Sequence, residues 1–159
     1  MANADVLPYD YVEFARTMQK YVPAVQSALG AAGWKTLSAA PIADAVTRME
    51  QAAVAYHTAR DRALANGVSA AVAKNTNEAL LKVERALTRP EGLKTRPWFR
   101  NLIYVADENN GYANMVFPSV NEAIRSGDQA LTQREILDLA MRFDAATAAV
   151  NAARAALTP

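Results

Sequence analysis

One stretch of the sequence, from Leu93 to Val120, differs from the rest because it has no helical periodicity and is rich in aromatic residues. It also contains two prolines, and it interrupts a series of alanine-rich segments. An ordered loop of this length is uncommon in a compact domain and is usually functional, whereas a disordered linker would be poor in aromatic residues. We therefore expect an ordered loop, counted from residue 89 to 119, that a helical scaffold presents.

The alanine-rich segments carry apolar residues in steps of three and four, which predicts amphipathic helices. The expected helices span residues 8–29, 41–65, 69–88, 119–127 and 132–157. Pro23 is expected to kink or break the first of them. No alternating pattern is long enough to support a sheet, although Leu102–Tyr104 fits a short extended piece. The predicted fold is all-α: an up-down four-helix bundle, with the loop between its third helix and a short helix that precedes the last long one.

Several local motifs are typical of helix N-termini. Ser119–Glu122 and Thr132–Glu135 each place a hydroxyl three residues before a glutamate, and in such a capping box both side chains bond to exposed backbone N–H groups. Ser69 is expected to cap the third helix. Alanines also lie outside the apolar stripe of the last helix, so a second backbone could approach it closely, including one from a second subunit; they are Ala145, Ala148, Ala149 and Ala152.

Composition excludes several classes of function. The chain has 17 basic and 16 acidic residues, so it is not expected to bind nucleic acid or a membrane surface by charge. It has no cysteine, and therefore no disulfide, thiolate nucleophile or cysteine metal site. No apolar run approaches the roughly 18 residues that span a bilayer. The first five residues also have no signal-peptide pattern.

The sequence offers no catalytic site of a familiar kind. His57 is the only histidine, and a di-iron or di-manganese bundle would require two Glu-x-x-His pairs. Asp61 lies one turn beyond His57, so the two could pair, although a satisfied or exposed histidine is the simpler interpretation. No Gly-x-Ser-x-Gly motif or phosphate-binding glycine loop is present. We expect no metal, no cofactor and no catalysis from this chain alone.

The loop has two interpretations. In the structural one, aromatic and apolar side chains plug the open end of the bundle, and residues 107–111 form a solvated turn; the plug consists of Trp98, Phe99, Ile103 and Phe117. In the functional one, that turn and Tyr112 face a ligand or another domain. Arg96, Arg100 and Tyr112 would then contact a bound anion. Aromatic clusters more often serve packing than recognition, which favours the structural interpretation on physical grounds alone.

The loop also carries a family resemblance. Arg96–Tyr104, Asn109–Ala113 and Phe117–Pro118 strongly resemble the C-terminal helical domain of the glutamate carboxypeptidase and transferrin receptor family, known as the transferrin-receptor-like dimerisation domain. Asp5–Tyr11 resembles the start of that domain, so the resemblance covers essentially the whole chain. It implies a single domain over residues 1–159, a C-terminal fragment of a larger peptidase whose zinc ions and general base belong to an absent peptidase domain.

The resemblance also implies roles for the loop. In the peptidases the loop reaches over the active site, where a lysine–tyrosine pair binds the C-terminal glutamate of the substrate. Tyr112 matches the tyrosine, but Gly111 stands where the lysine would be, which leaves glutamate recognition open. The substrate-binding residues of the parent enzyme would be Tyr112, Asn110 and Gly111. The scaffold of the loop would be Arg96, Pro97, Trp98, Phe99, Arg100, Tyr104, Phe117 and Pro118.

Two hypotheses follow. The first is a homodimerisation domain that completes the substrate pocket of a zinc-dependent carboxypeptidase or aminopeptidase, with the peptidase domain of the same parent as its other partner. The alternative is a stand-alone helical module that binds a ligand or protein through its aromatic loop. Neither includes nucleic acid or direct membrane contact. The compartment stays open, since an N-terminal segment of the parent could export or anchor it.

Overall fold

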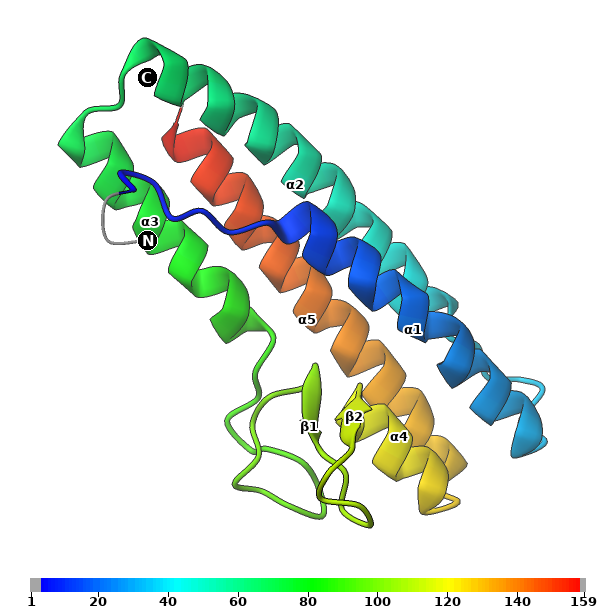
Figure 1. Ribbon diagram of the computed structural model, residues 1–159. Helices are drawn as coiled ribbons and strands as arrows, with labels where there is room; N and C mark the ends of the chain where they lie inside the picture. The colour runs from blue at the N-terminus through cyan, green and yellow to red at the C-terminus, as the bar shows by residue number, and fades with distance from the viewer. Residues whose placement is uncertain (1–3, 158–159) are drawn as a thin grey trace.

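The computed structural model describes residues 4–157. Over this range the chain is mostly helical, with five helices and one two-stranded antiparallel sheet (Figure 1). The elements are α1 Tyr11–Ala31, α2 Ala40–Asn66, α3 Ala70–Ala86, β1 Tyr104–Ala106, β2 Asn114–Val116, α4 Pro118–Arg125 and α5 Gln129–Ala156. The predicted helical class is therefore confirmed in its main part, while the small sheet was not predicted.

Helix α5 is the centre of the packing. Both α2 and α3 lie along it, and α1 packs on α2 (Figure 1). The four-helix bundle is not confirmed, because α3 ends at Ala86 and does not follow α5 to the loop end of the molecule. At that end, α4 packs against both α5 and α1, and β2 packs against α4. The loop region thus belongs to the core rather than only covering it.

Small side chains are common among the buried residues of α2 and α5. Buried alanines recur on both helices, among them Ala45 and Ala53 on α2 and Ala146 and Ala153 on α5. Alanine combines high helix propensity with a side chain short enough for close approach of two backbones. Larger side chains fill the remaining interior; the fully buried ones include Tyr56, Phe117, Phe143, Leu29, Met49, Leu80 and Leu139.

Local predictions of helix ends had mixed outcomes. Ser69 does cap α3, since its hydroxyl accepts a hydrogen bond from the N–H of Val72 at 3.3 Å. Of the kink or break expected at Pro23, a break is excluded, because α1 continues through it as one helix. The helix has buried side chains before and after the proline, at Val22 and Val25, and their packing offsets the missing backbone hydrogen bond.

Both predicted capping boxes are wrong. Helix α4 begins at Pro118, so Ser119 already lies inside it, and α5 begins at Gln129 with Asp128 as its N-cap. The Asp128 carboxylate accepts from the N–H of Leu131 at 2.8 Å. The glutamates of the two motifs are therefore available for other contacts, and both are buried.

Candidate functional site

The segment after α3 folds back on itself before it reaches the hairpin. The N–H of Arg89 donates to the carbonyl of Arg100, and that of Leu93 donates to the carbonyl of Phe99, each at 2.9 Å. Gly92 turns the chain with φ of 67°, a left-handed conformation that favours glycine. A β-carbon at this position would overlap the carbonyl oxygen of Pro97, so a side chain could not fit.

Arg89 fastens the start of this segment to α5. Its guanidinium donates to Glu135 at 2.7 Å and to Asp138 at 3.2 Å, and also to the Gly92 carbonyl at 3.0 Å. The arginine and Glu135 are both largely buried. One side chain therefore neutralises a buried carboxylate and satisfies a carbonyl of the loop backbone.

Arg96 fastens the middle of the loop to α4. It donates from Nε and Nη2 to one oxygen of Glu122, at 3.1 and 2.6 Å, and Thr95 donates to the other oxygen at 2.7 Å. Its Nη1 donates to the Ala106 carbonyl at 2.8 Å, and its guanidinium stacks over the Phe99 ring at 4.9 Å. With these internal partners, Arg96 is not positioned to contact a bound anion as the sequence analysis considered.

The aromatic residues of the loop separate into two groups. Phe117 and Ile103 are buried, and Phe117 meets Phe143 of α5 edge-on at 6.2 Å between ring centroids. Phe99 is partly buried beneath Arg96. Trp98 is 71% exposed, so its predicted place in the plug is wrong. Pro97 and Arg100 are exposed as well, so this turn of the loop lies at the surface.

The hairpin connection, residues 107–113, forms the tip of the loop. The N–H of Asp107 donates to the Ala113 carbonyl at 2.8 Å, and the Asn110 carboxamide oxygen accepts from the N–H of Tyr112 at 3.2 Å. These bonds give the tip its own structure. Tyr112 is fully exposed, and nothing lies within 4 Å of where a Gly111 side chain would begin. The three residues predicted to bind substrate therefore lie together at the outermost point of the hairpin.

Neither His57 nor a cluster of metal-ligating side chains gives a second candidate site within the described residues. The imidazole Nε2 of His57 lies 3.8 Å from Asp10, whereas Asp61 pairs with Arg60, so the possible pair of His57 with Asp61 is not formed. Among residues 4–157 there is no group of three or more histidine and carboxylate side chains that could hold a metal ion. Over the same range, no helix has the length and apolar character needed to cross a membrane.

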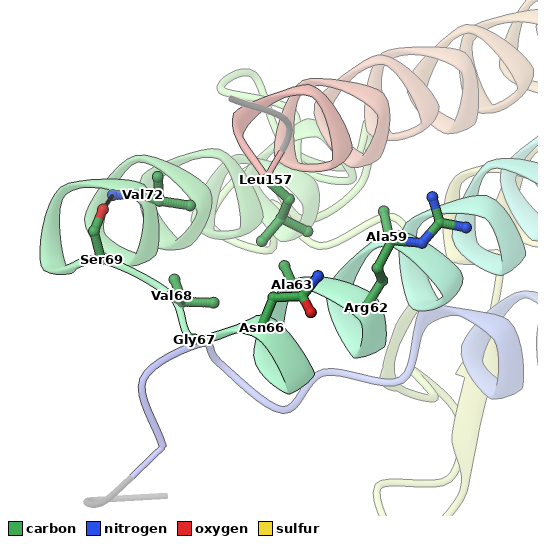
Figure 2. A pocket seen from close by; sticks show the side chains of 9 residues that line it. All are labelled: Ala59, Arg62, Ala63, Asn66, Gly67, Val68, Ser69, Val72 and Leu157. Carbon is green, nitrogen blue, oxygen red and sulfur yellow. Dashed lines mark hydrogen bonds between the residues drawn. The ribbon is translucent and has the colours of Figure 1, made fainter.

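A groove of about 470 Å³ lies where the ends of α2 and α5 and the start of α3 meet, away from the loop (Figures 1 and 2). Its wall is largely apolar, and Arg62 is the charged residue that lines it; the full lining is Ala59, Arg62, Ala63, Asn66, Gly67, Val68, Ser69, Val72 and Leu157. Such a surface can take apolar atoms but presents no acid–base pair.

The comparisons with known proteins agree with the loop motif. The family model described as the transferrin receptor-like dimerisation domain matches residues 37–151, which is most of the chain. This chain belongs to that family. The resemblance noted in the sequence is thereby confirmed, and the matched range contains the whole loop.

The relatives include probable glutamate carboxypeptidases and an inactive zinc metalloprotease. A probable glutamate carboxypeptidase of Arabidopsis thaliana is 25% identical over 134 residues, which is 84% of this chain and 18% of that protein. One of Arthroderma benhamiae is 24% identical over 129 residues, 81% of this chain and 18% of its own length. An inactive zinc metalloprotease of Schizosaccharomyces pombe is 31% identical over 70 residues, 44% of this chain and 9% of that protein. The chain thus spans about a fifth or less of each.

Proposed function

We propose that this chain is the homodimerisation and substrate-pocket-completing domain of a glutamate carboxypeptidase-like zinc metallopeptidase, and that it is not catalytic by itself. It would be the C-terminal domain of a longer parent, whose peptidase domain would hold the zinc ions. The small share of each relative that the chain spans supports this arrangement. The observation that carries the proposal is Tyr112, fully exposed at the tip of an anchored hairpin in a chain of this family.

The outer face of α5 supports a contact with a second copy. Leu137 and Met141 are 47% and 62% exposed there, one turn apart. Exposed alanines continue the same face at helical spacing, at Ala145, Ala148 and Ala152. A face of this kind lets another helix approach closely and buries apolar area when it does. We assign this face to the dimer.

Sedimentation of the 159-residue chain tests the dimer. We expect a concentration-dependent dimer that Met141→Lys shifts towards monomer, because a charge would have to be buried in the contact. Leu81→Lys is the control, since Leu81 is also an exposed apolar residue, at 46% against 62% for Met141, but belongs to α3 rather than to the proposed face. A wild-type chain that stays monomeric at high concentration would refute self-association, but would leave the role of the tip standing.

Tyr112→Phe in the full-length protein tests the role of the tip. Loss of the hydroxyl removes one hydrogen bond to the substrate, so we expect kcat/KM to fall roughly five- to tenfold, the equivalent of about 1–1.5 kcal/mol. The aromatic ring is retained, and an exposed hydroxyl does not hold the fold together. Unchanged kinetics would remove Tyr112 from the proposed site.

Substitutions at Gly111 test the substrate specificity of the full-length enzyme. The tip carries no basic side chain beside Tyr112, and a side chain at Gly111 would meet open space. Gly111→Lys is therefore expected to fold normally and to increase the preference of the full-length enzyme for a substrate with a C-terminal glutamate over one with a neutral residue. Gly111→Gln is the control for side-chain size without charge. Equal preference in both variants would contradict the proposed position of the tip.

A further inference from the structure

Arg125 reaches from the last turn of α4 to the base of the tip. Its Nη2 donates to Oδ2 of Asp107 at 2.7 Å, and its Nη1 to Oδ1 at 3.2 Å, so the two side chains meet as a bidentate pair. Glu108 adds a second carboxylate at 3.9 Å. The Asp107 side chain is only 12% exposed, although it lies in an otherwise open turn.

The remaining hydrogen bonds of the tip are internal. Asp107 bonds to Ala113 through its N–H, and its carboxylate also accepts from the N–H of Asn109 at 2.8 Å. The N–H of Ala113 donates to the Asn110 carbonyl at 2.9 Å. Such bonds fix the shape of the turn but not its direction relative to the helices. The direction requires a link from the turn to the helical body, and the side chain of Arg125 supplies one.

We propose that Arg125 is a positioning residue: by holding Asp107, it sets the direction in which the tip presents Tyr112 to the substrate pocket. This inference rests on the proposed function of the tip. Arg125 touches neither Tyr112 nor any residue we place in the pocket, so its effect passes through Asp107. A lysine could match the charge of Arg125 but not both contacts, because its ammonium is a single point of charge.

The environment of Asp107 agrees with a persistent pair. The guanidinium of Arg125, followed by the N–H of Asn109, lowers the pKa of the Asp107 carboxyl from 3.8 to about 2. The carboxylate is therefore charged throughout the range in which most proteins are stable. Arg125 lies in the last turn of α4, where the partial negative charge of the helix C-terminus favours a positive side chain.

Amide hydrogen exchange of the 159-residue chain tests the positioning. In Arg125→Gln we expect exchange at Asn109 and Ala113 to accelerate about two- to fivefold, as loss of a partly exposed ion pair predicts, with unchanged protection in α2 and α5. The exchange rates in Arg125→Lys should lie between those of the wild type and those of Arg125→Gln. The exchanged pair, Asp107→Arg with Arg125→Asp, should restore part of the protection at Ala113, whose N–H bonds to Asn110. Asn109 is left out of this comparison because it loses its own acceptor, the Asp107 carboxylate. Unchanged exchange in Arg125→Gln, or no recovery at Ala113 in the exchanged pair, would overturn the proposal.

Arg48 offers a matched control. It forms a bidentate pair with Asp144 between α2 and α5, at 2.9 and 3.0 Å, and both side chains are about half exposed. Arg48→Gln removes the same kind of ion pair from between two helices, neither of which belongs to the loop. It should leave exchange at Asn109 and Ala113 unchanged, and acceleration there would mean that the tip responds to any loss of an ion pair.

Kinetics of the full-length protein separate this inference from the function on which it rests. Arg125→Gln should lower kcat/KM several-fold, and the double variant with Tyr112→Phe should lose little more than Tyr112→Phe alone, because both act through one contact. Additive losses would overturn the positioning role. If Tyr112→Phe has no effect on kcat/KM while the exchange result holds, the proposed role of the tip in substrate binding fails, and Arg125 only orders the turn.

Discussion

The α2–α5 contact and the loop region are stabilised in different ways. Helices α2 and α5 pack along each other, and their buried side chains are mainly apolar, with several alanines among them. The loop instead depends on buried pairs of arginine and carboxylate, Arg89 with Glu135 and Arg96 with Glu122. The helices satisfy their own backbone polar groups, so apolar contacts suffice between them. A segment with little regular structure needs side chains to bond its carbonyls, and the two arginines do this at Gly92 and Ala106.

Arg96→Ala should break this arrangement most severely. It leaves Glu122, whose side chain is 4% exposed, with a buried charge and only Thr95 as partner. Loss of one member of a buried pair costs about 3–5 kcal/mol, which urea unfolding of the chain would measure. The double variant Arg96→Met with Glu122→Leu should lose much less, since no charge is left unpaired. A loss below about 1 kcal/mol in Arg96→Ala would mean that the loop does not depend on the pair.

Gly92→Ala should have the next largest effect. A side chain there would overlap the Pro97 carbonyl and would also occupy a left-handed conformation. We expect a loss of about 2–3 kcal/mol in urea unfolding. Gly33→Ala is the control, because Gly33 has φ of 75° with open space around it and should lose only about 1 kcal/mol from the backbone conformation. Equal losses would show that the close turn at Gly92 contributes nothing of its own.

Asp107→Asn should have the smallest effect, and one that depends on pH. The folded-state pKa of Asp107 is about 2, below its ordinary value of 3.8. A depressed pKa contributes stability that is fully present above the ordinary value and is lost as the pH falls through the folded value. The difference in Tm between wild type and Asp107→Asn should therefore shrink between about pH 4 and pH 2. A difference that stays constant over this range would exclude the charge of Asp107 as its cause.

The comparison explains which parts of the fold were predictable. The long helices bury a continuous apolar stripe, and such a pattern is visible in the sequence alone; residues 41–65 were expected to be helical, and α2 covers 40–66. The hairpin was missed because each strand has three residues, too few to show an alternation. Its pairing depends on partners such as Tyr104 and Val116, which lie 12 positions apart.

The site shows the same limit more clearly. Ser119–Glu122 and Thr132–Glu135 match a local capping pattern, but each glutamate pairs with a distant arginine instead. The arginine lies 26 residues earlier in the chain for Glu122 and 46 residues earlier for Glu135. A short motif contains no information about such a partner. The exposed position of Trp98 was missed for a related reason, since a large aromatic residue is most often buried. The role of Tyr112 in substrate binding stays a prediction.

Phe117 has a consequence for how the tip can evolve. Within the described residues, Phe117 is the one residue other than glycine with a positive φ, which is 49°. Its side chain is fully buried, and it lies directly before α4. Its N–H donates to the Ile103 carbonyl at 2.9 Å, which joins the hairpin to the helix that follows. One end of the hairpin is therefore fixed in the core, and the tip lies at its other end. A small rotation at Phe117 would produce a larger displacement at the far end, so substitutions in the core around Phe117 are expected to redirect Tyr112 even where the sequence of the tip is unchanged.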